Sequence, residues 1–126
     1  MENKLENVVK LIGYKKNPEP YIRASDVFVL SSMYEGLPNV LLEALYLKKY
    51  IISSNCPTGP KEILKNGKYG SLFKVKDHNH LFQLLKNYNK NLPLINNKIN
   101  QGYKSLFRFH YKTNCKKYFQ IISKYL

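Results

Sequence analysis

The chain has 126 residues, enough for one domain of ordinary size with a buried core, and 44% of them are hydrophobic, as in soluble globular proteins. No apolar run approaches the roughly 20 residues that a membrane-spanning helix requires, and the first residues carry no signal-peptide pattern. Cys56 and Cys115 lack the spacing of a metal site or of a secreted disulfide framework, so both are expected to be free thiols. These features together predict a cytoplasmic protein.

The excess of positive charge is the unusual feature of the composition. There are 21 Lys and Arg residues against 8 Asp and Glu residues, which leaves a net charge of +13. Such an excess favours phosphate-rich partners, namely nucleic acid, an anionic membrane surface or a substrate that bears a diphosphate. The lysines are spread from Lys4 to Lys124 without a dense basic run, so the charge alone does not choose among these partners.

The first third of the chain is predicted to contain two strands with a short helix between them. Residues 7–14 have the pattern of a strand that ends in a loop at Gly13, where a small residue permits positive φ or close backbone approach. The two prolines within residues 17–20 prevent regular structure before Tyr21, so a short helix is expected to follow them. Residues 27–30 are apolar without alternation, which predicts a parallel strand buried on both faces.

The middle third continues the alternation of helices and strands. A helix is predicted from Pro38 to about Lys48, because proline is tolerated in a first turn and apolar residues then recur at three- and four-residue steps. Strands are predicted over residues 49–54 and 71–73, separated by a tight loop, a short helix from Lys61 and a turn. This alternation predicts an α/β fold with a parallel sheet.

The last third is predicted to be helical. Asp77 can cap a helix that carries one apolar stripe, and Pro93 opens another helix toward Leu106. Residues 111–125 are predicted to form an amphipathic, basic helix with apolar side chains on one side and lysines elsewhere. The two histidines after Asp77 fit a polar helix-capping turn better than a metal site, because no matching cluster of Cys or His accompanies them.

Residues 31–44 connect the strand at 27–30 to the following helix. In an open α/β sheet ligands bind at this edge, and a helix N-terminus offers unpaired N–H groups and partial positive charge to a phosphate. Gly36 lets the backbone approach a ligand closely. Glu35 and Glu43 frame the helix start with seven residues between them, and Glu43 lies in an apolar run, where its carboxylate is expected to need a donor. The alternative is that Glu35 favours the helix dipole and Glu43 faces solvent.

The wider string resembles the retaining, nucleotide-sugar-dependent glycosyltransferases of family 4, which have the GT-B fold. The resemblance is carried by Ala-Ser-Asp-Val-Phe-Val-Leu-Ser-Ser from residue 24, Tyr-Glu-Gly-Leu-Pro-Asn from residue 34 and Leu-Glu-Ala from residue 42. It includes the E-x7-E motif of that family in Glu35 and Glu43. Residues 56–64 resemble a second recurrent block of the family, which ends in a short helix that faces the donor cleft.

The resemblance implies a role for each of these positions. Glu35, the catalytic candidate, contacts hydroxyls of the donor sugar, and Glu43 contacts the ribose of the nucleotide. The loop at Gly13 and Tyr14 lies against the nucleotide base, although Tyr14 could instead simply cover the sheet edge. The donor-binding residues implied in this way are Gly13, Tyr14, Glu35, Gly36, Leu37, Pro38, Asn39 and Glu43.

The implied reaction is transfer of a sugar from a UDP-sugar to a glycan or lipid-linked acceptor with retention of configuration, in bacterial surface-glycan assembly. No metal ion or other cofactor is implied. The match is to the later part of the C-terminal, donor-binding domain of a GT-B fold. Within this partial Rossmann-like domain, residues 1–75 are the nucleotide-sugar-binding part and residues 76–126 are the helical part. A peripheral position at the inner membrane is compatible with the charge.

The acceptor-binding domain and the strands that carry the diphosphate-clamping Arg and Lys are expected to be missing from this chain. The chain alone is therefore expected to be an incomplete, inactive fragment, arising by natural truncation or from a split gene. The alternative function is a basic nucleic-acid-binding module without catalysis, which the 11 tyrosines allow. That module would gather tyrosines and lysines on one exposed strand surface, whereas the predicted strands are apolar.

Overall fold

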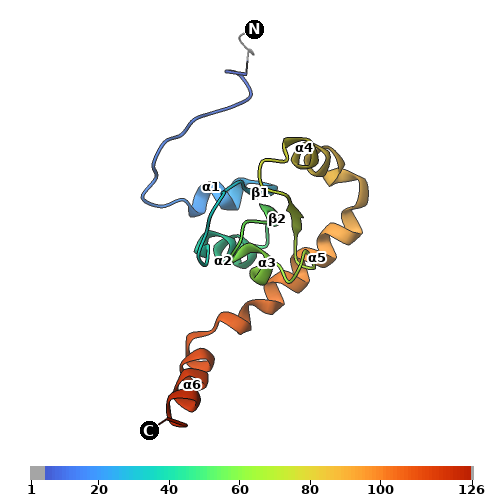
Figure 1. The fold of residues 1–126 in the computed structure, drawn as a ribbon. Helices are drawn as coiled ribbons and strands as arrows, with labels where there is room; N and C mark the ends of the chain where they lie inside the picture. The colour runs from blue at the N-terminus through green and yellow to red at the C-terminus, as the bar shows by residue number, and fades with distance from the viewer. Residues whose placement is uncertain (1–4, 126) are drawn as a thin grey trace.

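The computed structural model describes residues 5–125 and shows an α/β fold built on a three-stranded parallel sheet (Figure 1). The strands are β1 (Val27–Leu30), β2 (Tyr50–Ser54) and β3 (Ser71–Phe73), in the order β1-β2-β3. Val27 pairs with Tyr50 in one ladder, and Ile52 pairs with Ser71 in the other. Because the strands are parallel, the loops after β1, β2 and β3 all leave from the same edge of the sheet.

Helices connect the strands and follow them, as the sequence predicts. The α-helices are α1 (Glu19–Ala24), α2 (Asn39–Tyr46), α3 (Pro60–Ile63), α4 (His78–Asn87), α5 (Leu92–Lys104) and α6 (Tyr111–Ile122). Two 3₁₀ helices, η1 (Tyr88–Asn91) and η2 (Ser105–Phe109), join the C-terminal helices to one another. In Figure 1 the N-terminal arm and α6 extend from opposite ends of the body formed by the sheet and α1 to α5.

The central strand β2 is buried along its whole length, and its two faces belong to two apolar clusters. Ile51 points to the cluster that contains side chains of α1, α2 and α3. Tyr50 and Ile52 point to the other cluster, where Phe73 of β3 and Ile95 of α5 pack against them. Successive residues of a strand face opposite sides, so one buried strand is covered by helices on both sides of the sheet.

Two cations hold the C-terminal helices to the sheet layer. The Lys98 ammonium of α5 donates to the carbonyl oxygens of Gly67 and Gly70 at 3.0 and 2.8 Å, and burial lowers the pKa of this lysine. The guanidinium of Arg108 in η2 donates to the carbonyl oxygens of Glu62 and Ile63 at 3.3 and 2.9 Å. The two cations therefore tie α5 and η2 to backbone carbonyl groups of α3 and of the turn that follows it.

Most of the predicted elements are confirmed. The Asp77 carboxylate accepts a hydrogen bond from the backbone N–H of His80 at 2.9 Å, which is the cap expected for α4. Leu41, Ala44 and Leu45 of α2 are buried, as their spacing predicts. Both cysteines are free thiols, with Cys56 buried and Cys115 exposed.

The predicted strand over residues 7–14 is wrong. Residues 9–14 have no regular structure, and apolar side chains of this arm, such as Leu11, are exposed. The backbone N–H groups of Val8 and Val9 instead bond to the Leu5 carbonyl in a turn. A strand needs a neighbour for its backbone groups, and no described strand lies beside this arm to supply one.

Three smaller expectations are also corrected. β1 is half-buried rather than buried on both faces, with Val29 38% exposed, because it lies at an edge of the described sheet. Pro38 is the N-cap of α2 with an extended backbone, so the helix begins one residue later than predicted. Helix α1 begins at Glu19, before Tyr21, because Pro20 takes one of its first positions, where a missing N–H costs nothing.

We predict that Gly70→Ala destabilises the fold. A Cβ at this position would lie 2.6 Å from the carbonyl oxygen of Ile51 in the central strand, and that backbone atom cannot move aside cheaply. The expected loss is about 1 to 3 kcal/mol in the free energy of unfolding, measured by urea denaturation. Gly36→Ala is the matched control, because its Cβ would meet nothing within 4 Å. Equal stability of the two variants would contradict the packing described here.

Candidate functional site

The loops that follow β1 and β2 meet at the carboxyl edge of the sheet. The Ser54 hydroxyl, at the end of β2, donates to the carbonyl oxygen of Ser32 at 2.6 Å, and the backbone N–H of Asn55 donates to the Phe73 carbonyl oxygen at 2.7 Å. These bonds fix where the loops leave the sheet. They place residues 31–38 beside residues 55–59, so the two sequence blocks 31–44 and 56–64 come together in space.

The two loops are packed backbone to backbone. The Thr58 hydroxyl donates a short hydrogen bond to the carbonyl oxygen of Glu35. Gly59 has a φ of +89°, and a Cβ on it would lie 2.5 Å from the carbonyl oxygen of Gly36 and against the ring of Pro38. Only glycine provides both this backbone conformation and this close approach. The position of Gly36 and Pro38 therefore depends on a glycine in the other block.

The carboxylate of Glu35 is held within its own loop. The Ser32 hydroxyl donates to its Oε1 atom at 2.6 Å, and the side chain is half-buried. In the part of the chain that the structure describes, this is the one hydrogen bond to the carboxylate, so its second oxygen is left for another donor. A carboxylate oriented in this way can accept hydrogen bonds from hydroxyl groups of a ligand.

Residues 36–39 form the entrance to α2. Pro38 is buried, whereas Gly36, Leu37 and Asn39 are exposed. The first N–H groups of a helix have no partner within the helix, and at the start of α2 these are the N–H groups of Asn39 and Val40, since that of Leu41 bonds to the Pro38 carbonyl. A helix N-terminus attracts anions through these donors and its partial positive charge. No described group of three or more His, Cys, Asp and Glu residues is placed to hold a metal ion.

Glu43 is exposed, so its carboxylate faces solvent and needs no donor from the protein, and a donor from a ligand stays a prediction. It lies on α2 between the buried residues Leu41 and Ala44, so the apolar neighbours face the core while the carboxylate faces out. It lines a shallow cavity of about 250 Å³ together with Asn17, Pro18, Glu19, Tyr46 and Leu47. The cavity places Glu43 beside the segment that follows Gly13 and Tyr14.

Gly13 and Tyr14 are not brought to the other site residues. Both lie in the N-terminal arm, where Tyr14 is 91% exposed and a Cβ on Gly13 would meet nothing within 4 Å. Gly13 does adopt the positive φ of +63° that the sequence suggests for a turn. Their proposed role at the nucleotide base stays a prediction.

Ser32 and Thr58 bond within the candidate site, and sequence reasoning assigned them no role there. Both residues belong to the two blocks, but neither was assigned a role in the site. The signal was the presence of a short hydroxyl side chain in each loop, and such residues commonly bond to nearby loop backbone or carboxylate groups. That the hydroxyl of Thr58 would bond to the other block, 23 residues away in sequence, follows only from the fold.

A family comparison covers both loops of this site. The model of the family described as "Glycosyl transferases group 1" matches residues 2–105, which is most of the chain. The chain belongs to the group 1 glycosyltransferases. The match ends at η2, so α6 lies outside it.

Individual relatives are named as glycosyltransferases or sugar transferases. A glycosyltransferase of Methanocaldococcus jannaschii is 41% identical over 92 residues, covering 63% of this chain and 23% of the relative. The N-acetylgalactosamine-N,N'-diacetylbacillosaminyl-diphospho-undecaprenol 4-alpha-N-acetylgalactosaminyltransferase of Campylobacter jejuni is 31% identical over 104 residues, covering 82% of this chain and 27% of the relative. This group 1 chain thus spans about a quarter of the length of these relatives.

A solved structure shows the fold of the family. The crystal structure of TarM superimposes on 91% of this chain with a TM-score of 0.78 and 20% sequence identity, and the match covers 23% of TarM. TarM is a GT-B glycosyltransferase, so the predicted α/β fold of GT-B type is confirmed.

We predict that Gly59→Ala disrupts the contact between the two loops of this group 1 chain. Alanine would have to adopt the positive φ of this position, and its Cβ would push against the Gly36 carbonyl. The expected cost is about 1 to 3 kcal/mol in the free energy of unfolding. Amide chemical shifts of residues 35–39 should move in an NMR spectrum of the variant. Thr58→Val tests the hydroxyl separately and should lower the free energy of unfolding by about 1 kcal/mol. Unchanged shifts at residues 35–39 in Gly59→Ala would refute the contact.

Proposed function

We propose that the chain is the donor-binding part of a retaining glycosyltransferase of family 4. In this proposal the enzyme transfers a sugar from a UDP-sugar to a glycan or lipid-linked acceptor during bacterial surface-glycan assembly. The single observation that supports it most is the packing of Thr58 and Gly59 against residues 35–38, because it joins the two sequence blocks of the family at one sheet edge. Ligands of open α/β sheets bind at this edge.

The charge of the departing nucleotide diphosphate would be stabilised at the start of α2. The N–H groups there and the positive end of the helix need no rearrangement when charge develops on the leaving group. Retention of configuration and the absence of a metal requirement follow from the family resemblance and are part of the proposal. Gly36 and Leu37 are exposed at this point, which leaves room for the donor to approach.

The two carboxylates would contact different parts of the donor. Glu35, oriented by the Ser32 hydroxyl at 2.6 Å, would accept hydrogen bonds from the sugar hydroxyls near the reacting carbon, so it is the catalytic candidate. Glu43 lines the cavity of about 250 Å³ on the outer side of α2, where it would hold the ribose. Gly13 and Tyr14 would approach the base only if the N-terminal arm moved toward that cavity.

The class of acceptor and donor sugar is supported by the named relative. The Campylobacter jejuni enzyme transfers N-acetylgalactosamine and its name specifies a diphospho-undecaprenol-linked substrate. We extend to this chain the class of reaction, transfer of an N-acetylhexosamine or related hexose to a lipid-linked glycan. Transfer also requires a second protein surface that holds the acceptor against the donor. Positioning of the two reactants can lower the activation barrier by roughly 7 to 11 kcal/mol. These 126 residues alone are therefore proposed to bind the donor weakly and not to turn it over.

An NMR titration of the chain with UDP and with UDP-N-acetylgalactosamine tests the proposal. The amide signals of the non-proline residues in 35–40, together with those of Thr58 and Gly59, should shift and saturate together, and pyrophosphate alone should produce the smaller part of the shift. GDP, which differs from UDP in its base, is the matched control for recognition of the base. Shifts confined to the lysines of α4 to α6, without any at residues 35–40, would contradict the proposed site and indicate non-specific anion binding.

We predict that Glu43→Gln weakens UDP binding without destabilising the fold. Loss of one hydrogen bond from a charged group should cost about 1.5 kcal/mol in binding, at the lower end of the usual range because Glu43 is exposed. Stability should change by less than about 0.5 kcal/mol, as for surface substitutions. Isothermal titration or the NMR titration above measures the binding. Glu19→Gln, on the same cavity, is the matched control, and equal effects of both variants would remove the specific role of Glu43.

We predict that Glu35→Ala discriminates between a UDP-sugar and UDP. The variant should weaken binding of the sugar nucleotide while leaving the affinity for UDP nearly unchanged, because the carboxylate is assigned to the sugar alone. Ser32→Ala should give a smaller loss in the same direction, since it removes only the hydroxyl that orients the carboxylate. If the variant weakens the binding of UDP and of the UDP-sugar equally, Glu35 acts at the start of α2 and does not contact the sugar.

A further inference from the structure

The loop between β1 and α2 is held in place by hydroxyl groups more than by apolar packing. None of residues 31–37 belongs to either apolar cluster, and no backbone-to-backbone hydrogen bond joins these seven described residues to one another. The hydroxyl groups of Ser32, Ser54 and Thr58 instead donate to acceptors within the loop. The position of the Glu35 carboxylate therefore depends on these side-chain hydrogen bonds.

The Ser54 hydroxyl attaches the loop to the core of the protein. Ser54 is the last residue of β2 and is fully buried. The ladder between β1 and β2 ends with the pair of Leu30 and Ser53, so Ser54 lies one residue beyond the last pair. At this point its hydroxyl donates to the carbonyl oxygen of Ser32 at 2.6 Å. A side chain thus continues the attachment to β2 where the backbone ladder stops.

Two hydrogen bonds in series connect Ser54 to the Glu35 carboxylate. The bond from Ser54 fixes the peptide group that contains the Ser32 carbonyl, so the Ser32 side chain is left with rotation about χ1. The Ser32 hydroxyl then donates to Oε1 of Glu35 at 2.6 Å. Thr58 bonds to the backbone carbonyl of Glu35 and not to its side chain. Ser54 therefore acts on the carboxylate, whereas Thr58 acts on the main chain.

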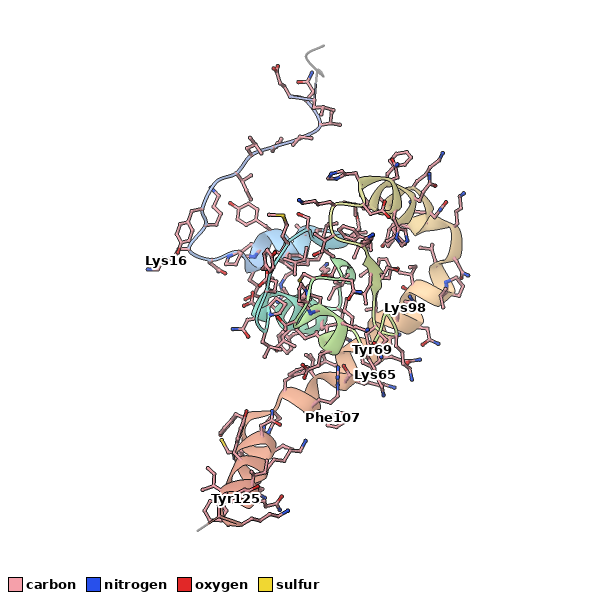
Figure 2. All side chains as sticks on the ribbon, viewed as in Figure 1. Lys16, Lys65, Tyr69, Lys98, Phe107 and Tyr125 are labelled. Carbon is pink, nitrogen blue, oxygen red and sulfur yellow. The ribbon has the colours of Figure 1, made fainter. Side chains whose placement is uncertain are left out.

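A cation does not orient this carboxylate among the described residues, although the chain has a large excess of positive charge. The one ion pair in this part of the chain joins Arg23 to Glu19. The half-buried Lys98 lies near Tyr69, where its ammonium bonds to carbonyl groups of the turn before β3 (Figure 2). Glu35 is therefore oriented by a neutral donor, which leaves its negative charge for a ligand.

We propose that Ser54 is a positioning residue for recognition of the donor sugar. Its buried hydroxyl fixes Ser32, and Ser32 orients the Glu35 carboxylate toward the sugar hydroxyls. This inference rests on the proposed function, in which Glu35 contacts the sugar and not the nucleotide. Without the Ser54 hydroxyl, the carboxylate would have to be ordered when the donor binds, and only the sugar contact would bear that cost.

Ser54→Ala tests this role, with Ser53→Ala as the matched control. Ser53 is also fully buried on β2, but its hydroxyl donates to the Ser54 carbonyl within the same strand. In NMR titrations, Ser54→Ala should weaken binding of UDP-N-acetylgalactosamine about three- to tenfold and that of UDP less than about twofold. Ser53→Ala should change neither affinity. Equal weakening of both ligands by Ser54→Ala, or the same selective loss in Ser53→Ala, would overturn the proposal.

Ser54→Cys guards against a general loss of folding in the alanine variant. Cysteine keeps nearly the volume of serine and replaces the hydroxyl with a weak donor, so it should cause the same selective loss of UDP-N-acetylgalactosamine binding. Urea denaturation of each variant shows whether the folded state is retained. A folded Ser54→Cys variant with unchanged affinity for the sugar nucleotide would contradict the role of the hydroxyl.

A double-mutant cycle with Glu35→Ala tests whether Ser54 acts through Glu35. In the Glu35→Ala background, Ser54→Ala should change the affinity for UDP-N-acetylgalactosamine less than about twofold, because the group that it positions is absent. A loss as large as that in the unmodified chain would show that Ser54 acts elsewhere and would overturn the proposal.

The carboxyl-carbon NMR signal of Glu35 in the free chain separates this inference from the proposed function. The signal should move in Ser54→Ala and stay in place in Ser53→Ala, and no movement in Ser54→Ala would overturn the positioning role without any ligand. If Glu35→Ala separates UDP-N-acetylgalactosamine from UDP but Ser54→Ala does not, the role of Ser54 is refuted and the proposed function stands. If Glu35→Ala does not separate them, the sugar contact of the proposed function is refuted, and the role of Ser54 in sugar recognition with it.

Discussion

The complete burial of β2 is the constraint on which the rest of the structure depends. Its five residues have helices on both sides, so each face needs its own apolar cluster, and those clusters fix where α2, α4 and α5 can lie. Gly70 and Gly102 are required where chain segments pass within van der Waals distance of this core, Gly70 against Ile51 and Gly102 against Leu45. The strand that organises the fold also sets the site, because its carboxyl end carries the loop of Thr58 and Gly59.

The site is therefore made by two loops that meet because their strands are neighbours. Glu35 and the start of α2 come from one loop, and the residues that hold them in place come from the other. The hydrogen bond from Thr58 to the Glu35 carbonyl and the close approach of Gly59 to Gly36 join the two loops directly. Such preorganisation lowers the cost of binding a charged donor, since little has to be rearranged when the ligand arrives.

Much of this could be predicted from the sequence, because local signals are strong in the body of the chain. The apolar periodicity of α2, the cap at Asp77 and the proline in the first turn of α5 each have a local physical cause, and each was confirmed. The arm at residues 7–14 could not be predicted, since its strand-like pattern describes what the residues favour and not whether a partner strand is present. The sequence left open whether Glu43 faces solvent, because an apolar run becomes an amphipathic helix only when its residues are placed around the helix axis. The contact of Thr58 with Glu35 could be found only from the fold.

The central claim is that the loop of residues 35–39, braced by Gly59, binds a nucleotide-sugar donor. Photo-crosslinking with a UDP-sugar that carries an azide on the uracil, followed by mass spectrometry of the labelled peptides, tests it most directly. We expect labels within residues 13–18 and 43–47, on either side of the cavity lined by Glu43, and we expect UDP to compete for them while pyrophosphate competes weakly. Labels distributed over the lysine-rich helices α4 to α6, displaced equally by pyrophosphate, would contradict the account.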